Sequence, residues 1–176
     1  MNWITAGQVM EEAEKPAVRI FVDADACPVK SEIYRVAERY ALHVYVVANA
    51  FMAVPRSELI ERVIVAEGPD AADDWIAERA TEFDIVVTAD IPLAAAALAK
   101  GGRVLDPRGE IYTNDNIEAR LTMRKFMDEL RAGGVDTGGP PPFNHGDRQA
   151  FARQLERLLA PAATAEFAPK PPPAGA

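Results

Sequence analysis

Two carboxylates follow an apolar run near the start of the chain. Residues 18–22 are apolar apart from Arg19, which is typical of a strand buried in a parallel sheet, and Asp23 and Asp25 come just after them. In open α/β sheets, ligands bind beyond the carboxyl ends of the strands, so we expect a functional site here. A structural role is the alternative, in which Asp23 closes the strand and Asp25 caps the helix that begins at Pro28.

Four further aspartates occupy comparable places later in the chain. Asp70, Asp73 and Asp74 open a predicted helix after the third strand, in a pattern like a capping box, and Asp90 follows the fourth strand. Carboxylates gathered at one edge of a sheet repel each other, so they must share protons or hold a cation. Oxygen ligands without a nearby Cys or His pair favour Mg²⁺ or Mn²⁺ over zinc. The predicted metal ligands are Asp23, Asp25, Asp70, Asp73, Asp74 and Asp90. Alternatively, each acid caps a helix or favours its dipole.

Alternating strand and helix patterns position these acids. Strands are expected at 18–22, 43–48, 62–65, 85–88 and 103–105, and helices at 28–40, 70–83, 92–100, 116–131 and 147–159. This rhythm predicts a three-layer α/β domain with a central, mostly parallel sheet of four to five strands, followed by C-terminal helices. The carboxyl ends of the first and fourth strands then lie at the same edge as the start of the helix after the third.

Composition narrows the class of protein. The 176 residues are 49% hydrophobic with a net charge of −8, which fits a globular protein and argues against sequence-independent binding of nucleic acid through a basic surface. No apolar stretch is long enough to cross a membrane, and the single cysteine excludes an internal disulfide, so we expect a cytoplasmic protein. We expect an N-terminal extension at 1–16, one domain at 17–159 that includes the C-terminal helices, and a disordered Ala/Pro tail at 160–176.

Several motifs resemble those of the YaiI/YqxD family of bacterial proteins. They lie at residues 23–30, 68–76 and 84–94, and residues 139–151 fit the C-terminal part of that family. The family is grouped with PIN-like domains, many of which are metal-dependent ribonucleases. The resemblance therefore implies a PIN-like fold and an acidic metal site.

The resemblance to PIN domains can be followed residue by residue. Asp23 matches the acid that ends the first strand, Asp73 the acid of the Asp-x-x-Ile-Ala helix, and Asp90 the acid after the fourth strand. The resemblance implies that these three are catalytic. The helical glutamate that usually supplies a further acid has no clear counterpart, and Glu58 is a weak candidate for it. Alternatively, the remaining aspartates Asp25, Asp70 and Asp74 substitute for it.

The resemblance and the acids together predict a divalent-metal-dependent phosphodiesterase of PIN type that acts on single-stranded RNA. Four arginines are expected to hold the nucleic-acid backbone: Arg108, Arg120, Arg124 and Arg148. Two alternatives stay open. One is a phosphatase of the haloacid dehalogenase type with Asp23 as its nucleophile. The other is a non-catalytic PIN-like binding module, which the missing glutamate favours.

Overall fold

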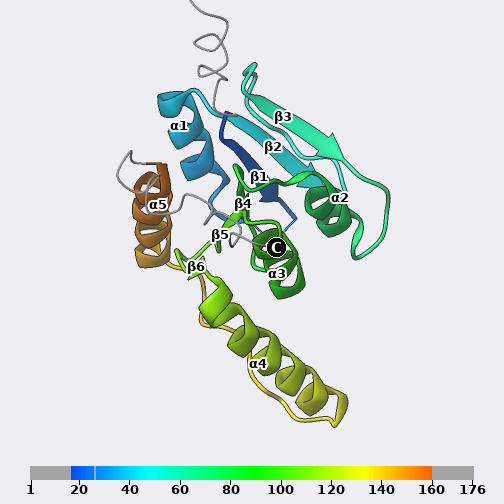
Figure 1. Ribbon diagram of the computed structural model, residues 1–176. Coiled ribbons are helices and arrows are strands. Elements are labelled where there is room, and N and C mark those ends of the chain that lie inside the picture. The colour runs from blue at the N-terminus through cyan, green and yellow to red at the C-terminus, as the bar shows by residue number, and fades with distance from the viewer. Residues whose placement is uncertain (1–16, 26, 160–176) are drawn as a thin grey trace, which may run out of the picture.

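A six-stranded sheet forms the centre of the computed structural model, which describes residues 17–25 and 27–159 (Figure 1). The strand order is β3-β2-β1-β4-β5-β6, and neighbouring strands are parallel except for β5 and β6. The strands are β1 (Arg19–Asp23), β2 (His43–Ala48), β3 (Ile60–Ile64), β4 (Ile85–Val87), β5 (Arg103–Leu105) and β6 (Ile111–Tyr112). The extension predicted at 1–16 and the tail predicted at 160–176 lie outside the described residues.

Five helices in this part of the chain cover the two faces of the sheet. They are α1 (Lys30–Tyr40), α2 (Ala71–Arg79), α3 (Ile91–Ala99), α4 (Asn114–Ala132) and α5 (His145–Leu159). Helices α1 and α5 contribute to the core on one face, while α2, α3 and the first turns of α4 contribute to the core on the other. The predicted three-layer α/β fold, with a mostly parallel sheet and C-terminal helices, is confirmed.

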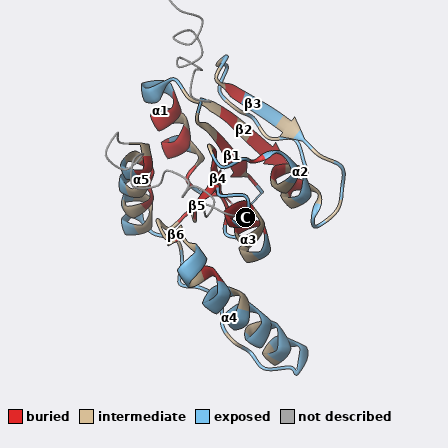
Figure 2. Cartoon of the chain, viewed as in Figure 1, coloured by how far each residue is buried: buried red, intermediate tan, exposed pale blue. Residues whose placement is uncertain are grey.

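The side chains of β1 alternate between the two cores because helices cover both faces of this strand. Ile20 and Val22 pack on the side of α1 and α5, and Phe21 packs on the side of α2 and α3. All three are buried, as are β4 and β5 (Figure 2). Burial on both faces explains why the sequence of this strand is a continuous apolar run. It also fixes Asp23, the last residue of β1, at the carboxyl edge of the sheet.

Four strands differ from the sequence prediction. β1 (Arg19–Asp23) is shifted by one residue from the predicted 18–22, and β4 (Ile85–Val87) ends one residue before the predicted 85–88. β6 was not predicted, because two residues are too few for an apolar alternation to be recognised; it pairs antiparallel with β5, with Val104 opposite Tyr112. β3 starts two residues before the predicted segment and ends one residue earlier, at Ile64. Its pattern is blurred because it is an edge strand with several exposed side chains.

Helix α2 ends at Arg79 and not near Phe83 as predicted. The reason is the buried carboxylate of Asp84, which accepts hydrogen bonds from the Thr81 backbone N–H (2.7 Å) and hydroxyl (2.9 Å). The same carboxylate pairs with both the Nε and Nη2 atoms of Arg19 in β1. This turn therefore replaces the last helical turn because it satisfies a buried charge.

Helix capping differs from the prediction at two helices. Asp70 is at the N-cap position of α2 but its side chain accepts no capping hydrogen bond, so the predicted capping box there is wrong. A capping box does form at α4, between Thr113 and Asn116. At α5, Asn144 Oδ1 accepts from the N–H of Asp147, whose carboxylate accepts from the N–H of Asn144. Asn144 therefore caps this helix, which begins at His145 and not at the predicted residue 147.

Helix α4 extends away from the rest of the domain (Figure 1). Ile117 is its one buried residue, and Leu121 is partly buried against the same core. Its second half is exposed, including Met123 and Phe126 (Figure 2). In the described part of the chain, no helix combines the length and apolar character needed to cross a membrane.

Candidate active site

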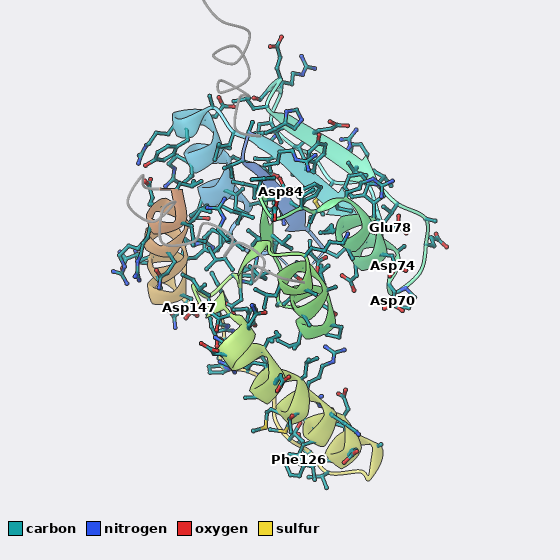
Figure 3. All side chains as sticks on the ribbon, viewed as in Figure 1. Asp70, Asp74, Glu78, Asp84, Phe126 and Asp147 are labelled. Carbon is teal, nitrogen blue, oxygen red and sulfur yellow. The ribbon has the colours of Figure 1, made fainter. Side chains whose placement is uncertain are left out.

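The parallel sheet brings the predicted acids to one edge. Asp23 ends β1, Asp90 follows β4, and the aspartates of α2 follow β3, so all lie beyond the carboxyl ends of parallel strands. Several of them face a pocket of about 360 Å³ between α2, α3 and α4. Its lining includes Asp70, Asp73, Asp74, Asp90, Leu93 and Arg124. Figure 3 shows Asp70 and Asp74 side by side at the start of α2.

Asp23 is half-buried beside β4. Its Oδ2 atom accepts a hydrogen bond from the hydroxyl of Thr88 at 2.9 Å. Burial raises the pKa of Asp23, and the charges of Asp25 and Asp90 raise it further, while the Thr88 hydrogen bond opposes them. The hydrogen bond from Thr88 holds the Asp23 carboxylate in place. None of the groups that shift the pKa of Asp23 is a positively charged side chain that would offset its negative charge.

Thr88 connects two of the acids, and sequence reasoning did not identify it. Its side chain is 1% exposed, and its hydroxyl donates to Asp23 and accepts from the backbone N–H of Asp90 at 3.0 Å. The available signal was its position, because Thr88 directly follows the apolar run of β4 and lies two residues before Asp90.

The two carboxylate oxygens of Asp90 have different surroundings: one caps helix α3, and the other faces Arg124. As the N-cap of α3, it accepts a hydrogen bond through Oδ1 from the backbone N–H of Leu93 at 2.8 Å. Its Oδ2 atom lies 4.0 Å from Nη1 of Arg124, which approaches from α4. The cap holds the carboxylate in place while leaving one oxygen directed at the pocket.

Asp73 experiences the strongest electrostatic perturbation at the site. Burial raises the pKa of Asp73 to about 7, and the charges of Asp90, Asp23, Asp70 and Asp74 contribute in that order. The acids from β1, the β4–α3 junction and α2 are thus close enough to affect each other's protonation. This repulsion is what a bound cation would relieve.

The charges of these carboxylates interact, but their oxygen atoms are too far apart in this structure to coordinate one metal ion together. Across residues 17–25 and 27–159, no group of three or more His, Cys, Asp or Glu side chains is close enough to hold a metal ion. The oxygen donors suit Mg²⁺ or Mn²⁺ in their chemistry. Their spacing in this structure would have to tighten around an ion.

Asp25 and two other polar residues near the acids have structural roles. The Asp25 carboxylate does not line the pocket, nor does it cap α1, whose N-cap is Val29; it accepts from the backbone N–H of Asn49 at 3.2 Å. The Asn49 side chain in turn donates to the carbonyl of Gly68. Cys27 is a buried packing residue, and burial raises the pKa of its thiol.

Glu58 does not join the acids. It precedes β3, whose first residue, Ile60, pairs in parallel with Val44 near the start of β2. Glu58 therefore lies at the amino edge of the sheet, opposite the edge that carries Asp23. The suggestion that Glu58 supplies the helical glutamate of PIN domains is therefore wrong.

Of the four arginines predicted to bind nucleic acid, Arg124 alone lines the pocket. Arg108 forms an ion pair with Asp147 at 2.8 Å, and Arg148 forms one with buried Glu32 at 3.0 Å. Arg120 pairs with Glu110. These three ion pairs fix the β5–β6 turn and helices α4 and α5 to the domain, while Arg124 faces the acids.

The raised pKa of Asp73 predicts a pH-dependent stability. The native state keeps a proton on Asp73 that the unfolded state, with a pKa near 3.8, has already lost. The stability from this group is therefore complete below about pH 4 and is lost as the pH rises through about 7.

Asp73→Asn should raise the melting temperature at pH 7.5, and this gain should shrink toward pH 5. Asp115→Asn, an exposed change in α4, should give a difference that does not depend on pH in this way; an equal pH dependence would contradict the local repulsion.

Comparison with known proteins gives the family. The sequence model described as "Uncharacterized BCR, YaiI/YqxD family" matches residues 21–161. A UPF0178 protein of Azorhizobium caulinodans is 54% identical over 147 residues, covering 84% of this chain and 92% of the relative. A UPF0178 protein of Hydrogenovibrio crunogenus is 54% identical over 144 residues, covering 81% and 95%. No solved structure matches the chain significantly. The family model and these relatives span most of the chain, which therefore belongs to the YaiI/YqxD family.

Proposed function

We propose that this protein is a divalent-metal-dependent phosphodiesterase of PIN type that acts on single-stranded RNA. The observation that carries the proposal is the gathering of acids from three chain segments beyond the carboxyl ends of parallel strands: Asp73 and Asp90 share a pocket with Arg124, and Asp23 lies close enough for its charge to act on both acids. Catalytic acids and a phosphate-binding cation are the groups that phosphodiester hydrolysis needs.

Asp23, Asp73 and Asp90 would hold the metal ion. Among the described contacts, Asp23 uses Oδ2 for Thr88 and Asp90 uses Oδ1 for Leu93, so each has a second oxygen for a cation. Burial, together with the charges of the neighbouring acids, raises the pKa of Asp73 to about 7, and a positive charge at this position would offset the repulsion between the acids. When bound, Mg²⁺ or Mn²⁺ lowers the pKa of a coordinated water and stabilises charge on the scissile phosphate.

The residues of the chain supply position and charge for such a reaction. The Thr88 hydroxyl binds both the Asp23 side chain and the Asp90 backbone, so it fixes the spacing of the two acids. Arg124 lines the same pocket, and its guanidinium would bind a phosphate oxygen of the substrate. A flexible single strand could bring a phosphate group into this pocket beside the acids, which is why we propose a single-stranded substrate. The choice of RNA follows from the resemblance to PIN domains, many of which are ribonucleases.

The phosphatase alternative requires two functional acids after β1. Asp25, the second of them, accepts a hydrogen bond from the backbone N–H of Asn49, which gives it a structural partner. The phosphatase also assigns no role to Asp73, whose charge interacts with those of Asp90 and Asp23. The observations therefore favour the phosphodiesterase.

A substrate comparison tests the proposal. The purified protein is incubated with Mn²⁺ and with four substrates: single-stranded RNA, the matching duplex RNA, single-stranded DNA and p-nitrophenyl phosphate. We expect cleavage of single-stranded RNA that EDTA abolishes, with slower or no cleavage of the duplex. Hydrolysis of p-nitrophenyl phosphate together with a phosphorylated Asp23 would instead establish the phosphatase. Mn²⁺ binding without turnover of any substrate would establish the binding module.

A further inference from the structure

Arg124 reaches from α4 toward the acids but is not firmly held. Its Nη1 atom lies 4.0 Å from Oδ2 of Asp90, and its Nε atom lies 3.9 Å from Oδ2 of Asp128. Both separations exceed hydrogen-bond length, and the side chain is 45% exposed. The guanidinium therefore lies between two carboxylates, one at the site and one on its own helix, and can move between them.

The backbone around this contact is well fixed. Ile117 and Leu121 pack α4 into the core that also contains Leu93 of α3, and Arg124 is located one turn beyond Leu121. Asp90 is fixed as the N-cap of α3. The distance between Asp90 and Arg124 is consequently set by the packing of two helices, and only the arginine side chain is free to change it.

We propose that Arg124 is the built-in counter-ion of Asp90 and that it competes with a divalent cation for the Oδ2 atom of this residue. Asp128 then receives the guanidinium when the cation binds. This inference rests on the proposed function, because it assumes that Asp90 is a metal ligand. It assigns Arg124 a second role besides phosphate binding, namely to lower the affinity of the free site for the cation.

The other charged residues near the pocket support a competition between Arg124 and a divalent cation for Asp90. Asp70, Asp73 and Asp74 add negative charge on the opposite wall, so the site attracts whichever cation is available. Arg120, one turn earlier on α4, is already paired with Glu110 and does not line the pocket. It therefore provides a matched control that removes the same charge from the same helix.

The test is a Mn²⁺ titration without nucleic acid, in which electron paramagnetic resonance measures the free ion. Arg124→Gln should tighten Mn²⁺ binding about three- to tenfold, because it removes a positive charge close to the site. Arg124→Lys, which keeps the charge, should stay closer to wild type. Arg120→Gln should change the affinity less than about twofold, since its charge is already neutralised by a partner and screened.

A second variant makes the inference more specific. Asp128 offers Oδ2 to Arg124 and pairs through Oδ1 with Arg131 at 3.0 Å. Asp128→Asn removes the charge that attracts Arg124 away from the site, so Arg124 should stay with Asp90 and Mn²⁺ binding should weaken about two- to threefold. In the Arg124→Gln background the same change should have a much smaller effect, because the two residues act through one contact. Equal effects of Asp128→Asn in both backgrounds would contradict the exchange.

The outcomes separate this inference from the proposed function. If the wild-type protein binds no Mn²⁺, both fail. If wild type binds Mn²⁺ through Asp90 and Arg124→Gln changes the affinity no more than Arg120→Gln does, the counter-ion inference alone fails.

Discussion

Asp90→Asn should reduce Mn²⁺-dependent cleavage of single-stranded RNA by about a hundredfold or more. The substitution removes the charge of one proposed metal ligand while preserving its structural role. An asparagine carbonyl at this position can still accept the hydrogen bond that the backbone N–H of Leu93 donates to Oδ1. The loss of activity should therefore come without a comparable loss of folded protein. Initial rates of cleavage of a fluorescent RNA, together with a melting curve, measure both.

Two comparisons make this result decisive. Asp115→Asn, which lies in the first turn of α4 outside the pocket, should keep the wild-type rate. Asp23→Asn should lose activity to a similar extent as Asp90→Asn, because Thr88 binds both residues in one arrangement. If the double variant at residues 23 and 90 cleaves RNA as fast as wild type, the activity belongs to a contaminant. The binding-module function would then be the better proposal.

The strands and helices that position the acids could be predicted because apolar runs, helix-starting residues and glycines mark them locally in the sequence. The bounds predicted for β2 and β5 agree with the structure, since each strand consists mainly of apolar residues that are covered on both faces of the sheet. The meeting of Asp23, Asp73 and Asp90 at one edge could be predicted because parallel strands share the direction of their carboxyl ends. Neither inference needed knowledge of side-chain partners.

Partners distant in sequence could not be predicted. Asp84 ends α2 early through its hydrogen bonds with Thr81, and its buried carboxylate is paired there with Arg19, 65 residues away. No local pattern indicates that distant contact. The four candidate arginines were equivalent in sequence, yet one faces the acids and three bind carboxylates elsewhere in the domain. Sequence pattern thus located the site, while tertiary contacts decided which charged residues are available to it.

Mn²⁺ or Mg²⁺ should raise the melting temperature of the wild-type protein. Burial and then the neighbouring acids raise the pKa of Asp73 and Asp23, and a bound cation would stabilise their ionised carboxylates. At a metal concentration about one hundred times the Kd, binding to the native state alone adds about 2.7 kcal/mol. For a protein of this length, that corresponds to a rise of about 5–10 °C. Differential scanning fluorimetry at constant ionic strength measures the shift, with NaCl in the metal-free sample to match screening.

Asp23→Asn should raise the melting temperature without metal and remove most of the rise that Mn²⁺ causes. Near neutral pH, the ionised Asp23 opposes folding because burial and two neighbouring acids disfavour its charge. An asparagine can still accept the hydrogen bond from Thr88, so the variant should lose the repulsion and keep the contact. A variant that is less stable than wild type without metal would show that the Asp23 carboxylate is structural. A variant that Mn²⁺ still stabilises in full would place the cation elsewhere, and the proposed metal site would have to be abandoned.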